Sequence, residues 1–367
     1  MKRPVKRLVT RARKPAPLDD PKRRARLDPA GMGDRIESLP AQLRAGGDLA
    51  APALGRLSPD LPRRLVLFGM GGSAIAGDLL RLLADREGSV PVHVVRHYEP
   101  PAWVTPEDFL VFSSYSGGTE ETLEAYRTLR RLKARSVVLT TGGTLGALAR
   151  EDGIPIAALP AGHPPRAALG YSFSTLVHLA GHVGVVASAE RRLEAAARGV
   201  EEVVSTNGRS VVQSRNSAKK LAIRLGGRGV LVLGAERAQA PVALRWKGQL
   251  NENSKHLAWA STVPEMTHNE VDGLIFPKGL ARKTAVVLLR DAADHPRVAK
   301  RFDWLKTHFG RRGARVETVT VTGADPMTRL FRGVAIGDLV SYYLALGNGA
   351  DPSALPGVES LKKALLR

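Results

Sequence analysis

The fold of this 367-residue chain is decided by LVLFGMGGSAIAGD, residues 65–78, and FLVFSSYSGGTEET, residues 109–122. Each segment begins with large apolar residues typical of a buried strand, passes through glycine and hydroxyl residues, and ends in a pattern typical of an amphipathic helix. A turn that leads a strand into a helix N-terminus presents free backbone N–H groups and the positive end of the helix dipole, which bind anions. Two such turns on neighbouring parallel strands predict a phosphate held between them.

The composition indicates a globular protein of two domains. Hydrophobic residues make up 43% of the chain and charged residues 25%, and 367 residues exceed the size at which a single core stops growing. No apolar run approaches the roughly 18 residues of a membrane span, so we expect no membrane partner. The absence of cysteine excludes disulfides and a cysteine nucleophile, and it fits a reducing compartment. The N-terminus lacks the apolar core of a secretory signal, so a cytoplasmic location is expected.

Positive charge is concentrated at the N-terminus. Residues 1–28 hold eleven Lys or Arg and three Asp, which contributes +8 to the formal net charge of +20. Because this segment is rich in charge and proline and lacks apolar periodicity, we expect a disordered basic arm. Such an arm could contact nucleic acid or an acidic surface. The chain has no nucleic-acid motif, however, so a nucleic-acid partner is not expected.

The rest of the chain alternates strands and helices in two runs. After a leading helix, the first run has strands at residues 65–68, 92–95, 109–112, 136–140 and 154–159. The second run follows a helical stretch and has strands at residues 229–233, 285–289 and 316–321. This alternation predicts parallel sheets with helices on both faces.

The expected domain organisation follows from these two runs. The segments are a basic arm (1–28), an N-terminal α/β domain with a leading helix at 32–49 (29–190), a helical linker (191–228), a C-terminal α/β domain (229–350) and a C-terminal helix (351–367).

The glycine turn after the first strand also allows a dinucleotide interpretation. Residues 69–74, GMGGSA, satisfy the G-x-G-x-x-A pattern, which expects an acidic residue after the second strand for the ribose hydroxyls. Arg96 and His97 stand there instead, and an Arg suits a 2′-phosphate, so an NADP-dependent oxidoreductase stays open. The second turn, Ser114–Thr119, has three Ser or Thr hydroxyls and two glycines. It favours a phosphate monoester, although Ser and Thr also cap helices for purely structural reasons.

A metal site is the other alternative. His178 and His182 stand four residues apart in a predicted helix, which is the spacing of two zinc ligands on one face. No HExxH pattern accompanies them, and residues 176–186 are otherwise apolar. We therefore expect two buried structural histidines and no metal.

Five ordered motifs carry a family resemblance. They are GMGGSAIAGD (69–78), SYSGGT (114–119), PRAALGY (165–171), NENSK (251–255) and PEMTHN (264–269). With them the chain, from about residue 27 to its end, resembles the phosphoglucose/phosphomannose isomerase family of archaea and some bacteria, which is built from sugar isomerase (SIS) domains. Gly118 stands where the family usually has Asn, and Ala74 where Gly is usual. Both departures lie beside the phosphate loops and bear on affinity more than on chemistry.

The resemblance implies a fold and an activity. The fold is α/β, with two SIS-type domains, each a parallel sheet flanked by helices, and a C-terminal helix that returns to the active site. The activity is a metal-independent aldose–ketose isomerisation, without a cofactor, of glucose 6-phosphate and mannose 6-phosphate to fructose 6-phosphate through a cis-enediol. A homodimer with its active site near the interface is expected. The alternative on the same fold is a non-catalytic phosphosugar sensor, but no helix-turn-helix module is evident.

The chemistry needs a carboxylate base, a histidine for ring opening and one or more cations. By resemblance, Glu252 is the base that forms the enediol, and Arg166 faces the enediolate. His268 is the ring-opening acid/base, which related isomerases supply across a dimer interface. Glu265 and Glu270 are the rival carboxylates.

The remaining site residues are also assigned by resemblance. A lysine of the C-terminal helix is brought over the site; Lys362 fits best, with Lys363 one residue away. The expected phosphate ligands are the residues of the two turns, Gly72, Ser73, Ser114, Ser116 and Thr119.

Overall fold

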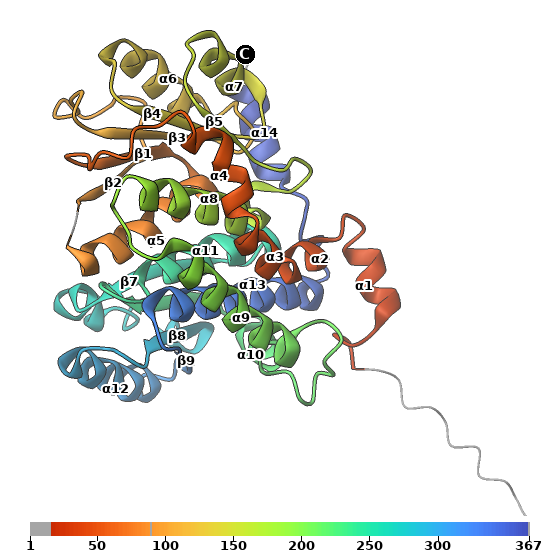
Figure 1. Cartoon of the computed structure of the whole chain (residues 1–367). Coiled ribbons are helices and arrows are strands. Elements are labelled where there is room, and N and C mark those ends of the chain that lie inside the picture. The colour runs from red at the N-terminus through yellow and green to blue at the C-terminus, as the bar shows by residue number, and fades with distance from the viewer. Residues whose placement is uncertain (1–15, 89, 366–367) are drawn as a thin grey trace, which may run out of the picture.

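The computed structural model (Figure 1) describes residues 16–88 and 90–365 and contains two parallel sheets. The N-terminal sheet has the order β2-β1-β3-β4-β5 and the C-terminal sheet the order β7-β6-β8-β9. The strands are β1 Leu65–Gly69, β2 Val92–Val95, β3 Phe109–Ser113, β4 Ser136–Thr140, β5 Ile156–Ala158, β6 Gly229–Ala235, β7 Ala258–Val263, β8 Thr284–Asp291 and β9 Arg315–Val321. All pairings between these strands are parallel, which confirms the predicted α/β class.

Helices connect most of the consecutive strands and cover both faces of each sheet. The helices are α1 Pro21–Leu27, α2 Met32–Glu37, α3 Leu39–Arg44, α4 Gly46–Leu54, α5 Gly71–Glu87, α6 Glu120–Leu129, α7 Gly143–Glu151, α8 Leu169–His182, α9 Ala189–Asn207, α10 Ser217–Leu225, α11 Ala240–Ser254, α12 Pro296–Arg311, α13 Pro326–Asn348 and α14 Pro356–Leu365. Short 3-10 turns are η1 Arg130–Leu132, η2 Pro165–Ala167, η3 Glu265–His268, η4 Glu270–Asp272 and η5 Ala281–Lys283.

The strands place alternate side chains in two different cores, as their two-residue period requires. In β1, Leu65 and Leu67 face a central core, whereas Val66 and Phe68 face an outer core beneath α6 and α7. All four side chains are essentially inaccessible to water. The continuous apolar run read from the sequence therefore reflects a strand covered on both faces.

One central core joins the two sheets. Val230 and Val232 of β6 belong to the same apolar cluster as Leu65 and Leu67 of β1. Figure 1 shows α5, α8, α11 and α13 between the sheets, while α12 covers the far face of the C-terminal sheet. The two halves are therefore joined by shared packing of the central helices.

Helix α13 lies at the middle of this core. It is the one helix in the described residues with the length and mean hydropathy, 1.2, of a membrane span, and 83% of its apolar window is buried inside the protein. Its apolar character is accounted for by contact with α9, α10 and α11.

The end of the predicted basic arm is ordered, contrary to expectation. Residues 21–27 form α1, in which the Asp20 carboxylate caps the first turn and Pro21 occupies the first helical position. Arg23 donates a hydrogen bond of 2.7 Å to the carbonyl of Leu346 on α13. Local composition argued for disorder, but these cap and tertiary contacts favour the helix. Residues 1–15 of the arm lie outside the described residues.

The predicted leading helix is also different in detail. Residues 32–49 form α2, α3 and the first part of α4 rather than a single helix. Pro40 is the second residue of α3, and Gly46 is the first residue of α4. A proline in a continuous helix would remove an i→i−4 hydrogen bond, so the break between α2 and α3 has a local cause.

Candidate active site

The first glycine turn lies between β1 and α5. Gly71 has a φ of +49°, in the left-handed region that glycine adopts without strain. A Cβ on Gly72 would lie 2.9 Å from the carbonyl oxygen of Pro165, so the turn packs directly against η2. Ser73 is buried in the first turn of α5. The turn therefore leads a buried strand into a helix N-terminus, as the sequence predicted.

The second turn lies beside the first, because Gly69 pairs with Ser113 in the register of β1 and β3. The Ser114 hydroxyl is buried and lies 2.8 Å from the Thr119 hydroxyl. Ser116 is exposed at the tip of the turn. Both turns therefore meet at the carboxyl edge of the N-terminal sheet, where ligands bind in open α/β folds.

Arg166 in η2 is held by hydrogen bonds from its Nε and Nη2. Its Nε donates to Asn253 Oδ1 at 2.7 Å, and its Nη2 donates to the carbonyls of Pro352 and Ser353 at 2.7 and 2.9 Å. The residue is 5% exposed. Burial lowers the pKa of Arg166, whereas the nearby Glu252 carboxylate acts in the opposite direction. An arginine stays protonated under such a shift, so the site keeps a buried positive charge.

Glu252 faces this arginine from the last turn of α11. Its Oε2 lies 3.6 Å from Arg166 Nη1, and its side chain is 39% exposed. Helix α11 continues past Glu252 to Ser254. Glu252 is therefore on rigid backbone, with one oxygen toward the arginine and the carboxylate partly open to solvent.

A cavity of about 320 Å³ connects these groups, which is within the size range of small-molecule sites. Its lining includes three of the residues predicted for the site, Gly72, Arg166 and Glu252. Arg96, considered only for a dinucleotide, and Gly71 of the first motif also line it, whereas sequence reasoning missed the others, which are Ile75, Leu244, Arg245, Lys247, Gly248 and Gln249. The spacing of Leu244, Gly248 and Glu252 along one face of α11 was the available signal.

His268 is not brought to this cavity within a single chain. It ends η3, is exposed and does not line the cavity. In the described part of the chain it has no side-chain hydrogen bond. The rival carboxylates are engaged locally, because Glu265 accepts from Asn269 at 3.2 Å and Glu270 accepts from the Ser261 hydroxyl.

Lys362 and Lys363 lie on α14, and none of the described side chains of this helix is buried. Neither lysine lines the cavity. The apolar residues Val358, Leu361 and Leu365 of this helix are each more than two-fifths exposed.

Lys255 is a cation that the sequence did not single out. It caps α11 with a φ of +51°, and its ammonium donates to the carbonyls of Asn253, at 3.2 Å, and Asp351. Burial and the neighbouring Arg166 lower its pKa. Lys255 and Arg166 thus bind carbonyls of three consecutive residues, 351–353, in the segment that leads to α14.

The residues that suggested a metal site or a dinucleotide site lie in structural surroundings. His182 Nε2 lies 2.9 Å from the carbonyl oxygen of Leu57, and burial lowers the pKa of His178. Arg96 is paired with the buried Asp78 carboxylate of the first motif. No cluster of three or more potential metal ligands occurs within residues 16–88 and 90–365.

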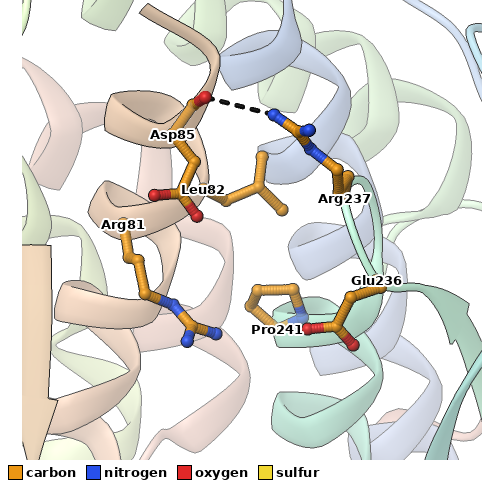
Figure 2. Close-up of a pocket in the computed structure, with 6 residues that line it drawn as sticks. All are labelled: Arg81, Leu82, Asp85, Glu236, Arg237 and Pro241. Atoms are coloured by element: carbon orange, nitrogen blue, oxygen red, sulfur yellow. Dashed lines mark hydrogen bonds between the residues drawn. The ribbon is translucent and has the colours of Figure 1, made fainter. Parts of the chain in front are cut away.

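A second cavity continues from the site along the boundary between the two halves. It has a volume of about 570 Å³ and shares Arg96 and Leu244 with the site cavity. Figure 2 shows the adjoining pocket, where Arg81 and Asp85 of α5 face Glu236 and Arg237, which precede α11. Arg237 donates to the Asp85 carbonyl at 3.1 Å. Most of the side chains that line this pocket are charged, and neither Arg166 nor Glu252 is among them.

Family comparisons agree with this geometry. The family described as SIS domain matches residues 62–175, and the family described as bacterial phospho-glucose isomerase C-terminal SIS domain matches residues 214–365. The fold and site therefore define a protein of the SIS-domain sugar phosphate isomerase class.

Curated relatives identify the family within this class. The bifunctional phosphoglucose/phosphomannose isomerase of Caldicellulosiruptor bescii is 33% identical over 334 residues, which cover 91% of this chain and 98% of the relative. That of Aquifex aeolicus is 34% identical over 303 residues, which cover 82% and 90%. The chain belongs to the bifunctional phosphoglucose/phosphomannose isomerase family and is an isomerase, which confirms the resemblance read from the motifs.

Solved structures share the fold at lower identity. A hypothetical protein from Thermus thermophilus gives a TM-score of 0.70 at 19% identity, with 96% of this chain and 94% of that chain covered. A glucose-6-phosphate isomerase like protein from the same organism gives 0.62 at 19% identity, with 92% and 98% covered. These similarities support the arrangement of two parallel sheets.

Proposed function

We propose that this chain interconverts glucose 6-phosphate and mannose 6-phosphate with fructose 6-phosphate through a cis-enediol, without a metal ion. The observation that carries the proposal is the Arg166–Glu252 pair, 3.6 Å apart in a cavity lined also by Gly72 of the first phosphate turn. A carboxylate beside a buried guanidinium at a phosphate turn provides the base and the electrostatic stabilisation that aldose–ketose isomerisation needs.

Glu252 is assigned to the proton transfer. Its carboxylate takes the proton from C2 of the open-chain aldose, and the electron pair moves into an enediolate. A proton passes from O2 to O1, and Glu252 returns its proton to C1, which gives the ketose. The negative charge that develops on the sugar oxygens is stabilised by Arg166. Because the arginine is already fixed by Asn253 and two carbonyls, it needs no reorganisation when this charge appears.

His268 is assigned to ring opening in a homodimer. An imidazole can exchange a proton with the ring oxygen and the C1 hydroxyl near neutral pH. Its exposed position outside the cavity of its own chain supports supply from a second copy. Twofold symmetry would place each His268 at the other copy's cavity.

The phosphate group is assigned to the two turns. Gly72 offers backbone at the N-terminus of α5, and Ser73, Ser114, Ser116 and Thr119 offer hydroxyls. Tight packing of the turns at adjacent strand ends supports this assignment. Lys362 is assigned to the active site, which it would reach when α14 closes over the cavity. The protein is assigned to the cytoplasm.

A coupled assay tests the function. Fructose 6-phosphate is measured from glucose 6-phosphate and from mannose 6-phosphate, each in the presence of EDTA. The proposal predicts turnover of both sugars. Turnover of one sugar alone would restrict the activity to that epimer, and binding without turnover of either would favour a phosphosugar sensor.

A further inference from the structure

A closed ring of hydrogen bonds holds Arg166. Its Nε donates to Asn253 Oδ1 at 2.7 Å, Asn253 Nδ2 donates to the Ser341 hydroxyl at 2.9 Å, and that hydroxyl donates to the Asp338 carbonyl at 2.7 Å. The Asp338 carboxylate accepts two bonds from Arg245, at 3.0 and 2.7 Å. Arg245 Nη2 closes the ring by donating to the carbonyl of Arg166 at 2.8 Å.

The five members of this ring are shielded from water. Asn253 and Ser341 are 0% exposed, Arg245 and Asp338 are 4% exposed, and Arg166 is 5% exposed. A buried polar group that loses its partner bears its full desolvation cost, so each bond in such a ring depends on the others. In the observed arrangement every member of the ring has a hydrogen-bond partner within it.

The ring also connects the two halves of the fold. Arg166 follows the N-terminal sheet in η2, whereas Arg245 and Asn253 lie on α11, and Asp338 and Ser341 lie on α13. Both the backbone and the side chain of Arg166 are held, because its carbonyl is bound by Arg245 and its Nε by Asn253. Of its guanidinium nitrogens, Nη1 is the one that lies toward Glu252.

We propose that Arg245, Asn253, Asp338 and Ser341 are positioning residues, which act on the isomerisation by fixing the Arg166 guanidinium in the cavity. This inference rests on the proposed function of Arg166. A displacement of about 1 Å at a charged catalytic group lowers turnover by up to about a hundredfold. The ring therefore governs the chemical step, whereas the phosphate turns govern binding of the substrate.

The ring is tested with Ser341→Ala, which deletes one hydroxyl, and with Asn253→Ala, which deletes the bond to Arg166 itself. Each variant is expected to lower kcat by about tenfold or more while KM stays within about threefold, because the lost interaction acts in the transition state. Since both residues act through one ring, the double variant should lose about as much kcat as the more impaired single variant.

Trp246→Phe is the matched control. Trp246 lies on α11, is fully buried, and donates a bond of 2.9 Å to the carbonyl of Gly333 on α13. The substitution thus removes one buried bond between the same two helices, outside the ring and outside the cavity lining. It should lower the melting temperature, as Ser341→Ala should, with kcat within about twofold of wild type.

The outcomes separate the two proposals. Wild-type protein that turns over neither sugar would refute the proposed function and the positioning role with it. Turnover in wild type, together with a kcat of Ser341→Ala and Asn253→Ala equal to that of Trp246→Phe, would overturn the positioning role alone. Additive losses of kcat in the double variant would likewise show that the two residues do not act through one ring.

Discussion

Mixing two inactive variants would show whether each active site draws on two chains. Glu252 lines the cavity of its own chain, while His268 is exposed outside it. Glu252→Gln and His268→Ala are each expected to lose nearly all activity. If the two groups meet across a twofold dimer, a dimer of one variant with the other has one site with both substitutions and one site with neither.

The recovered activity can be calculated. After random exchange of equal amounts, about half of the dimers are mixed and each has one intact site of two, so about a quarter of wild-type activity should appear. The assay is fructose 6-phosphate formation, with subunit exchange verified by native mass spectrometry of chains carrying different tags. Verified exchange without recovery would refute the assignment of His268 to the partner's site.

A reverse mixture serves as the control. Wild type mixed with an equal amount of the double variant keeps about half of the wild-type activity if both groups act within one chain. Sharing across the interface leaves about a quarter, because mixed dimers then have no intact site. A site shared across the interface therefore raises the activity of the first mixture from near zero to about a quarter, and lowers that of the second from about half to about a quarter.

Three further predictions concern stability and the C-terminal helix. Gly117→Ala should cost about 3 kcal/mol or more of unfolding free energy in urea titrations, because its φ is +69° and a Cβ would lie 1.9 Å from a carbonyl oxygen. Gly118→Ala is the control, because its Cβ would make only an ordinary contact of 3.9 Å with the Ser116 hydroxyl, and equal losses would contradict the reasoning. Lys362→Met should lower kcat/KM more than Lys363→Met, and the reverse order would move the assignment by one residue. Burial lowers the pKa of His178 below 6.5, so the unfolded chain binds the proton more readily and stability should fall as pH drops below about 6.5; His178→Gln should flatten that slope, and an unchanged slope would exclude His178 as its source.

The central strands β1 and β3 of the N-terminal sheet could be predicted from sequence because both of their faces are buried. β1 and β3 are each buried along their whole length, which leaves an apolar run bounded by glycine or serine. β7 was missed for the converse reason. Its central residues are only partly buried, and it includes Ser261 and Thr262 at an edge of the sheet. An edge strand of this kind has no apolar alternation to detect.

The site could be predicted only in part. The glycine turns were recognisable because their chemistry is local, and Glu252 and Arg166 were assigned by family motifs. The ring around Arg166 was beyond sequence reasoning, because it joins residues 166, 245 and 338, which no local pattern connects. Helix α1 was missed for a similar reason, since its contact with Leu346 spans 323 residues.

Hydrogen exchange at carbon tests the central claim most directly. Glucose 6-phosphate is incubated in D₂O with wild type or Glu252→Gln, and deuterium bound to carbon in the recovered sugar phosphates is measured by NMR. The account predicts deuterium at C1 of fructose 6-phosphate with wild type and almost none with Glu252→Gln, although that variant still binds the sugar phosphate. Exchange by Glu252→Gln at the wild-type rate would contradict the role of Glu252 as the base.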